Sequence, residues 1–263
     1  MNKNIVFITN IKNPLKPERS EVYDLSIQSW KIWSEKNNVD LFVLDEALFP
    51  LDQMSPIYFR HYWPQLLPDV IDEQICTVDA DTIIHPDCPN FFEETEGKYC
   101  GVHNDGDYDW IIRSIENYLY TFKENPVALE CWNFDGWNER IWKYINSGFM
   151  ITNQNFQFLH EKLLEFYWKY QKDVVNCQKT YGVGTDQPLI NLFISGMINP
   201  DDFKVLPYRY NMQDLARKGV LDERFLFTEI PGIYHFNAIE GGPTQVNFWM
   251  KKTYNHLFGD GRI

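Results

Sequence analysis

The sequence predicts an α/β fold in which helices flank a mostly parallel central sheet. Near the N-terminus a strand, a helix and a second strand follow one another at residues 5–9, 20–36 and 41–44, which is the order of a βαβ unit. A further buried strand is expected within residues 74–86, after a short helix at residues 58–68. Strands and helices that alternate in this way are typical of a parallel sheet with helices on both faces.

Local patterns justify each of these elements. Residues 5–9 form a short apolar run, which predicts a fully buried strand, and residues 41–44 form a second one. Strands are also predicted at residues 99–103, 144–152 and 233–236. The helix at residues 20–36 is predicted by apolar side chains that recur at three- and four-residue steps and so share one face: Tyr23, Ile27, Trp30 and Trp33. Asn155 suits the N-cap of a later helix, whose apolar stripe is Phe156, Leu159, Leu163, Phe166 and Tyr170.

Composition limits the classes of protein to which the chain can belong. The 263 residues contain no linker rich in proline, glycine or serine, so one domain spanning residues 1–263 is expected. The formal net charge of −13 and the pI near 4.9 argue against nonspecific binding to nucleic acid or to an anionic membrane surface.

The cysteines and the apolar runs indicate a compartment. Five cysteines, an odd number without Cys-x-x-Cys spacing, predict neither a zinc site nor a disulfide framework. No apolar run is long enough for a signal peptide or a membrane span. A cytoplasmic protein without a transmembrane segment is therefore expected.

Two carboxylates, Asp79 and Asp81, follow the central strand and are separated by the small residue Ala80. Alternate side chains of an extended chain lie on the same face, so both carboxylates are expected to point to one place. Like charges so close repel one another, and a hard divalent cation such as Mn²⁺ or Mg²⁺ removes the conflict. Two turn-forming aspartates are the simpler alternative, but the hydrophobic runs on both sides favour a metal site that binds a diphosphate.

Other polar residues lie near further strand or helix ends. Arg60 stands among aromatic residues, where a surface position and contact with a phosphate or sugar are equally open. Asn146-Ser147-Gly148 opens a strand with small residues, which permit close approach of a ligand or form a bulge. Asp186 and Gln187 precede Pro188 at a helix N-terminus, where an ordinary N-capping role also explains Asp186.

The remaining candidates have simple structural explanations. The acidic residues of 104–110 match a calcium loop only in part, because Trp110 stands where a glycine is needed. Trp132, Trp137 and Trp142 are sugar platforms or, more commonly for such clusters, core residues. A histidine on an apolar run is usually a core residue. No neighbouring residue in the sequence indicates another role for the following histidines: His61, His85, His103, His160 and His256.

In their order along the chain, these clusters resemble the retaining sugar-nucleotide transferases of the glycogenin and lipopolysaccharide galactosyltransferase type. The resemblance rests on an N-terminal strand and on Arg60, Asp79-Ala80-Asp81, Asn146-Ser147-Gly148, Thr185-Asp186-Gln187 with Asn191, and His235-Phe236. It covers most of the chain. It implies a single GT-A (nucleotide-diphospho-sugar transferase) domain whose Asp-x-Asp (DxD) motif binds manganese, which in turn holds the diphosphate of the donor.

The resemblance also implies roles for individual residues. It makes Asp79, Asp81 and His235 the metal ligands, with Ala80 in the same cofactor-binding segment. It places Arg60 near the donor. The residues implied to line the nucleoside pocket are Ile8, Thr9 and Asn10, and those implied to surround the donor sugar, with catalytic roles, are Asn146, Asp186 and Gln187.

One part of the family pattern is missing. The family carries Gly-x-x-Lys-Pro-Trp soon after the histidine, and the lysine contacts the diphosphate. Here Gly241-Gly-Pro-Thr-Gln245 follows, and the nearest lysines are Lys251 and Lys252. The phosphate contact is therefore expected from elsewhere, or the donor is atypical.

The implied reaction moves a hexose or related sugar from a nucleotide-diphosphate donor, expected to be a UDP-sugar, to a hydroxyl acceptor, expected to be a glycan. Under retention, the departing phosphate can take the proton of the acceptor, and no protein base is required. Inversion would require a carboxylate base, for which the candidates are Asp105, Asp107 and Asp109.

Three alternatives stay open from the residues. A phosphatase with an aspartyl nucleophile also uses hydrophobic residues before Asp-x-Asp, and Asp201-Asp202 with Lys204 could serve as its later acidic site. A non-catalytic carbohydrate-binding module would use the tryptophans but leaves the paired acids unexplained. A transferase acting on hydroxymethylated nucleic acid is disfavoured by the acidic balance of the chain.

Overall fold

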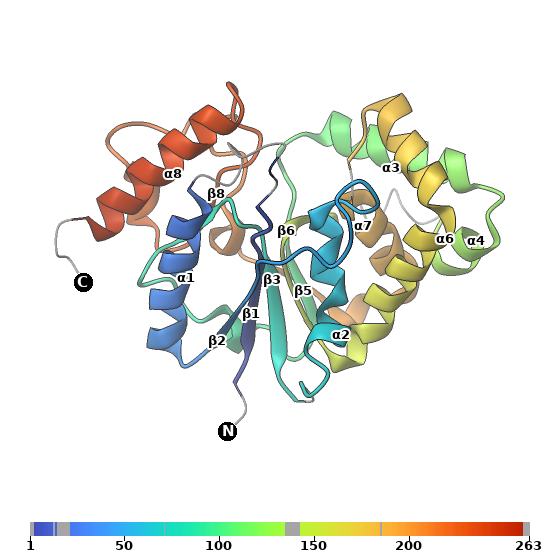
Figure 1. Cartoon of the computed structure of the whole chain (residues 1–263), viewed down its shortest axis with the longest axis horizontal. Coiled ribbons are helices and arrows are strands. Elements are labelled where there is room, and N and C mark those ends of the chain that lie inside the picture. Colours follow the sequence, from blue (N-terminus) through green and yellow to red (C-terminus); the bar gives the residue numbers. More distant parts are fainter. Residues whose placement is uncertain are drawn as a thin grey trace.

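Six strands form the central sheet of the computed structural model, which describes residues 3–12, 14, 22–70, 72–134, 143–184 and 186–259. The strand order is β2-β1-β3-β6-β5-β7 (Figure 1). β6 is antiparallel to its neighbours β3 and β5, whereas the other pairs are parallel, so the predicted mostly parallel sheet is confirmed. The strands are β1 (Ile5–Thr9), β2 (Asp40–Leu44), β3 (Gln74–Val78), β5 (Tyr99–His103), β6 (Ile145–Asn153) and β7 (Phe203–Leu206).

A second, two-stranded sheet brings the C-terminal part of the chain to the end of β3. It consists of β4 (Thr82–Ile84) and β8 (Ile233–His235), which are antiparallel, with Thr82 opposite His235. Because β4 begins directly after the two aspartates, this pairing sets His235 beside Asp81.

Helices cover both sides of the central sheet. In Figure 1, α1 and α8 lie on one side, and α3, α4, α6 and α7 lie on the other. The α-helices are α1 (Tyr23–Asn37), α2 (Trp63–Leu66), α3 (Tyr108–Phe122), α4 (Pro126–Cys131), α6 (Gln157–Tyr181), α7 (Asp186–Met197) and α8 (Pro243–Phe258). The 3₁₀ helices are η2 (Pro56–Tyr62), η3 (Phe91–Glu94), η5 (Gln154–Phe156), η6 (Pro200–Asp202), η7 (Tyr208–Asn211) and η8 (Leu226–Glu229). In the described part of the chain, every helix is too short or too polar to cross a bilayer.

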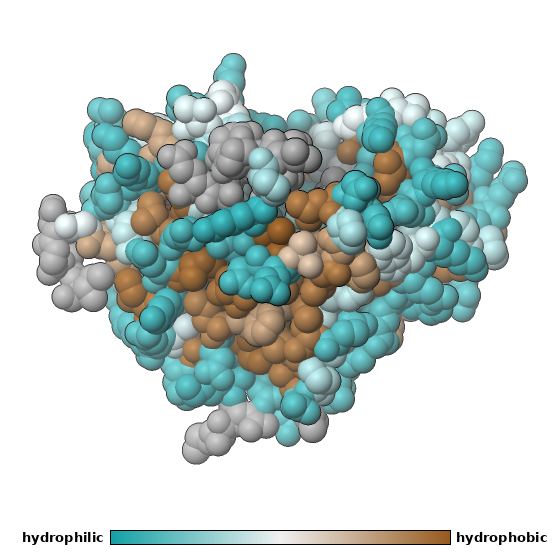
Figure 2. All heavy atoms as spheres, viewed as in Figure 1, coloured by the Kyte–Doolittle hydropathy of each residue, from teal (hydrophilic) through white to brown (hydrophobic). Residues whose placement is uncertain are grey.

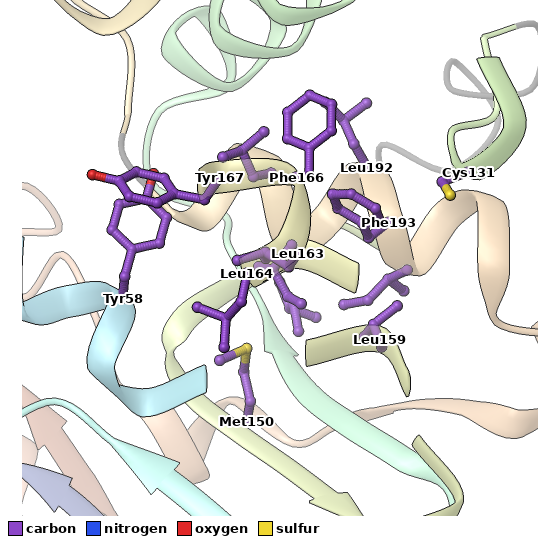
Figure 3. Packing of buried hydrophobic residues seen from close by; sticks show 14 of the residues in the cluster. Tyr58, Cys131, Met150, Leu159, Leu163, Leu164, Phe166, Tyr167, Leu192 and Phe193 are labelled. Carbon is purple, nitrogen blue, oxygen red and sulfur yellow. The ribbon is translucent and has the colours of Figure 1, made fainter. Parts of the chain in front are cut away.

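The two faces of the sheet pack into separate hydrophobic clusters, because successive strand residues point to opposite faces. Phe149 belongs to the cluster with the α1 residues Trp30 and Trp33. Met150, its neighbour, belongs to the cluster with α6 and α7. Figure 3 shows Met150 pointing from the sheet toward Leu164 of α6. Both faces are therefore buried, as expected for a central sheet of this kind.

The outer strand β2 is less covered than the central strands. Its residues Leu41, Phe42 and Val43 are half-buried. Figure 2 shows apolar side chains gathered on the face over β1 and β2, with hydrophilic side chains around them. The polar residues of the candidate site lie elsewhere, at the ends of the strands.

Two local predictions differ from the structure. The central strand ends at Val78, and residues 79–81 form a turn into β4 rather than a continuation of the strand. Asn155 is not the N-cap of α6, which begins at Gln157. β6 runs on to Asn153, whose side chain accepts a hydrogen bond from the Asn155 amide at 2.9 Å, so the chain already turns at that earlier asparagine.

Candidate active site

Polar side chains from four elements meet where the parallel strands β1 and β3 reach their carboxyl ends. Asp79 and Asp81 follow β3, and His235 ends β8. Because β6 is antiparallel to β3, its first residues, including Asn146, lie at the same edge. Arg60 comes to this edge from η2. The carboxyl edge of a parallel sheet is where ligands of α/β proteins usually bind.

Three of these side chains form a cluster that could hold a metal ion. One ligand atom from each of Asp79, Asp81 and His235 lies within 4.8 Å of the others. His235 Nε2 is 3.3 Å from Asp81 Oδ1 and 3.6 Å from Asp79 Oδ2. Two carboxylates and an imidazole suit a divalent cation. The predicted convergence of the two acids is therefore confirmed, although a turn rather than strand alternation produces it.

Hydrogen bonds hold the turn that carries the acids. Trp30 Nε1 in α1 donates to Thr82 Oγ1 at 3.0 Å, and Thr82 Oγ1 donates to the Asp79 carbonyl at 2.7 Å. The Asp79 amide donates to the Gly148 carbonyl at 3.0 Å, and the Phe236 amide donates to the Asp81 carbonyl at 2.9 Å. The turn is thereby tied to α1, β6 and β8, which fixes the positions of both carboxylates.

The charges in the cluster shift one another's pKa. Burial alone would raise the pKa of Asp81, but the neighbouring His235 lowers it overall. Burial alone would lower the pKa of His235, but Asp81 and then Asp79 raise it overall. Without a cation, the two carboxylates favour the charged form of His235. A bound cation would balance the carboxylates instead and displace the proton.

A second layer of hydrogen bonds orients His235. Its Nδ1 lies 2.9 Å from Asn211 Oδ1, and Asn211 Nδ2 donates to Asn146 Oδ1 at 3.0 Å. Since the Asn211 oxygen can only accept, His235 carries its proton on Nδ1 and can use Nε2 as a ligand. Asn211 was not predicted from the sequence, because it lies in the short 3₁₀ helix η7, far along the chain from the motifs it connects.

Arg60 links the metal cluster to the start of α7. It is only 6% exposed, so a solvated surface position is excluded. Its guanidinium donates to Asp79 Oδ1 and to the Ser147 carbonyl, and its Nε lies 3.6 Å from Asp186 Oδ2. Burial alone would lower the pKa of Arg60, but Asp79 and Asp186 raise it. Arg60 is thus a permanent buried cation between two acids.

The two polar residues at the start of α7 lie beside β6. Asp186 is 2% exposed, and its Oδ1 is 3.4 Å from Ser147 Oγ. Burial alone would raise the pKa of Asp186, but the Arg60 charge and the contact with His61 lower it. Gln187 Oε1 accepts from the Ser147 amide at 3.1 Å. Residues 145–147 extend beyond the end of β3, so side chains of α7 satisfy backbone groups that β3 does not reach.

Asn191 also satisfies backbone groups of β6, and it pairs with both the N–H and the carbonyl of one residue. Its Oδ1 accepts from the Ile145 amide at 2.8 Å, and its Nδ2 donates to the Ile145 carbonyl at 2.9 Å. This explains why an asparagine stands one helical turn after Gln187. Thr185, which precedes Asp186 in the same motif, lies outside the described residues.

A pocket of about 260 Å³ opens beside Asn146 and Gln187. Most of the residues that line it are of polar type, and one is a tryptophan: Asn104, Asp107, Trp110, Asn146, Gln187, Asp214, Arg217, Asn237 and Ala238. Arg217 Nη1 lies 3.3 Å from Asp214 Oδ1 and 3.7 Å from Asp107 Oδ2. Asp107 also caps α3, accepting from the Trp110 amide at 2.9 Å. Amides, acids and an aromatic ring are suited to the hydroxyls and apolar face of a sugar.

The residues expected to line a nucleoside pocket end β1. Ile8 is fully buried in a hydrophobic cluster, so its side chain serves the core. The side-chain oxygens Thr9 Oγ1 and Asn10 Oδ1 are buried, and among the described residues neither has a hydrogen-bond partner. Buried polar atoms without partners are uncommon in proteins.

The segment that replaces the family's lysine motif forms the turn before α8 with its two glycines and the first turn of α8 with its last three residues. Gly241 and Gly242 have positive φ angles of 89° and 65°, which favour glycine. Lys251 and Lys252 lie farther along α8 and are exposed. Among the residues that line the pocket, Arg217 is the cation.

Comparisons with solved structures found chains similar to this one. The chain is similar to a glycosyltransferase involved in glycosylation of the major capsid of PBCV-1, with a TM-score of 0.52 and 9% identity over 94% of this chain and 98% of that chain. It also matches apo mouse xyloside xylosyltransferase 1, with a TM-score of 0.46 and 15% identity over 90% of this chain and 98% of that one. A third match is the glycosyltransferase GlyE of Streptococcus pneumoniae TIGR4, with a TM-score of 0.45 and 14% identity over 98% of this chain and 64% of that one.

The first of these matches confirms the expected GT-A fold, whose central sheet is mostly parallel and flanked by helices. At 9% identity the similarity concerns the fold alone. No protein-family model matches the sequence, and no curated protein matches it.

Proposed function

We propose that the protein is a metal-dependent glycosyltransferase of the retaining type, and that residues 1–263 form one GT-A domain. The donor is a nucleotide-diphosphate sugar, in our proposal a UDP-sugar, and the acceptor is a hydroxyl of a glycan. The observation that carries this proposal is the meeting of Asp79, Asp81 and His235 at the carboxyl edge of the sheet. The pocket beside Asn146 and the fold shared with a glycosyltransferase support it.

The three clustered side chains would hold the cation, and their donor atoms fit Mn²⁺ or Mg²⁺. A bound cation of this charge stabilises negative charge that develops on a leaving diphosphate. In this proposal the nucleoside lies at the carboxyl end of β1, beside Thr9 and Asn10. Asn146 and Gln187 belong to the wall of the pocket, where the transferred sugar would lie.

The positions of the acids fit retention best. Asp105 is paired with Lys218 at 2.7 Å, and Asp109 lies in the first turn of α3. Asp107 lines the pocket but is already a helix cap and a partner of Arg217. Asp214, the other acid on the pocket wall, is likewise paired with Arg217. Both acids at the pocket are thus ion-paired, so a route that needs no protein base is favoured. An inverting route would use Asp107.

The two non-transferase alternatives are less well supported. Asp201 and Asp202 precede β7, which is parallel to β5 and β3, so they lie at the opposite edge of the sheet from Asp79. They cannot complete a phosphatase site with it. Trp132 is 4% exposed within the core and offers no sugar platform, whereas Trp137 and Trp142 lie outside the described residues.

The proposed place of action is the cytoplasm. All five cysteines are free and buried, which agrees with a reducing compartment. A nucleic acid acceptor is disfavoured by the net charge of −13.

Donor hydrolysis tests the proposal. Purified protein is offered a panel of nucleotide sugars with Mn²⁺ or with a chelator, and release of nucleoside diphosphate is measured. The expected result is slow, metal-dependent hydrolysis of one or a few donors, which disappears in Asp81→Ala while the circular dichroism spectrum is unchanged. Turnover that survives in this variant, or that ignores the metal, would contradict the assignment.

A further inference from the structure

Two buried histidines meet directly behind the candidate site. His61 lies in η2 and His160 in α6, 99 residues apart in sequence. Both are fully buried, and their Nδ1 atoms are 2.9 Å apart. On the other side of its ring, His61 Nε2 lies 3.5 Å from Asp186 Oδ2. A row of interacting side chains thus runs from the edge of the site into the core, in the order Asp186, His61 and His160.

The short nitrogen-to-nitrogen distance determines that a proton lies between the rings. Two Nδ1 lone pairs at 2.9 Å would repel, so one Nδ1 must carry a hydrogen and donate it to the other. Burial lowers the pKa of His61, and it lowers that of His160 well below the usual value. Each ring is therefore neutral and carries one hydrogen, which leaves two possible arrangements.

Asp186 selects between these arrangements. If His61 donates from Nδ1, its Nε2 lone pair faces the Asp186 carboxylate, and the two repel. If His160 donates from Nδ1, His61 carries its hydrogen on Nε2 and directs it toward Asp186. At 3.5 Å this is a long, mainly electrostatic contact, but its sign is favourable only in the second arrangement.

The row of interacting side chains formed by Asp186, His61 and His160 ends at His160. Among the described residues, His160 Nε2 has no hydrogen-bond partner. Its ring packs against the indole of Trp63, with ring centroids 5.7 Å apart, and against the ring of Tyr99, with ring centroids 6.0 Å apart. In the described part of the structure no hydrogen bond leads on from His160 Nε2, so the histidine pair is suited to holding an orientation rather than to conducting protons.

We propose that His160 is a positioning residue, which fixes the tautomer of His61 so that His61 donates toward Asp186 and holds its carboxylate at the site. The structural part of this inference concerns protons on the two rings. Its catalytic part rests on the proposed function, in which Asp186 supports the donor sugar.

Nitrogen-15 NMR of the intact protein with labelled histidines tests the structural part. Two-bond couplings between ring nitrogens and carbon-bound protons identify the tautomer of each neutral ring. The expected result is Nε2–H for His61 and Nδ1–H for His160, and His61→Gln and His160→Asn assign the signals. An Nδ1–H tautomer at His61, or a charged ring at neutral pH, would overturn the inference whether or not the protein transfers sugars.

A pair of variants tests the catalytic part. Asparagine at position 160 keeps an N–H close to the place of Nδ1, whereas leucine removes it. His160→Leu is expected to lower kcat by about 10–100-fold, the loss seen when residues that orient metal ligands are removed, with little change in the donor KM. His160→Asn is expected to recover most of kcat. Equal kcat in the two variants, at matched thermal stability, would show that the histidine only fills space.

Discussion

Gly148 lies so close to His235 that a Cβ placed on the glycine would stand 2.4 Å from the imidazole Cε1. The same Cβ would stand 2.6 Å from Asp79 Oδ2. Gly148→Ala is therefore expected to displace two of the three proposed metal ligands, with an overpacking penalty of about 1–3 kcal/mol. We expect a large loss of Mn²⁺ affinity, measured by isothermal titration calorimetry.

Gly219→Ala is the matched control for this glycine. A Cβ there has no atom within 4 Å, although its φ of +67° makes alanine strained. It should lower stability without changing Mn²⁺ binding. Equal Mn²⁺ affinity in Gly148→Ala and the wild type would mean that the cation does not bind at this cluster.

Asp81→Asn is expected to abolish metal-dependent donor turnover. The change keeps the shape of the side chain but removes the charge that balances His235, which is 3.3 Å away. The pKa of His235 should fall, because Asp81 is the largest of the causes that raise it. Titration of the His235 ring by NMR checks this. An unchanged titration would show that the ring and the carboxylate are not coupled in solution.

Arg60→Gln is expected to destabilise the fold more than any change on the pocket wall. It leaves Asp79 and Asp186 without their shared buried cation. Removing one partner of a buried ion pair typically lowers the free energy of unfolding by about 3–5 kcal/mol. Urea denaturation measures the loss, and Arg224→Gln, which breaks an exposed pair with Asp222, is a control expected to have almost no effect.

Arg217→Gln is expected to alter the substrate preference of the pocket. Arg217 neutralises only one of the two acids beside it, Asp107 and Asp214, so the wall has a net negative charge. The wild type should therefore disfavour uronic acids relative to uncharged hexoses, and the variant should disfavour them more. Competition between a neutral and a uronic donor measures this. A preference that shifts toward the uronic sugar in the variant would contradict the charge balance.

The buried histidine pair predicts a loss of stability in acid. In an unfolded chain a histidine has a pKa of about 6.5, whereas burial lowers the pKa of His61 and His160 in the native state. Below about pH 6.5 the unfolded state thus binds more protons than the native state. The free energy of unfolding therefore decreases as the pH is lowered, by up to about 1.4 kcal/mol per pH unit for each histidine. Denaturant titrations across this range should show a shallower fall in His160→Asn. Equal slopes would indicate that His160 protonates in the native state.

The elements and the acid pair were predictable because their signals are local. An apolar run or a helical stripe such as that of Trp30 and Trp33 is visible within a short window. Asp79 and Asp81 are separated by one residue only, and the apolar residues around them favour one binding point. That the chain turns there could not be predicted, because the turn depends on hydrogen bonds from α1, β6 and β8.

The deeper parts of the site depend on distant residues. His61 and His160 each resemble an isolated core histidine, since nothing in the sequence indicates that they touch. The resemblance places Gln187 beside the donor sugar and gives Asn191 no role, yet the side-chain oxygens of both accept backbone N–H groups of β6. The partners of a buried polar side chain are set by the packing of elements, which a single sequence does not display.

The pairing of β4 with β8 has a consequence for biosynthesis. Asp81 leaves the ribosome early, but His235, which stands opposite the neighbouring Thr82, is made much later. Chains grow from the N-terminus, and their first parts can fold before the last are made. A nascent chain that already displays its paired acids thus has no complete set of ligands until β8 emerges, so a truncated translation product would lack the proposed activity.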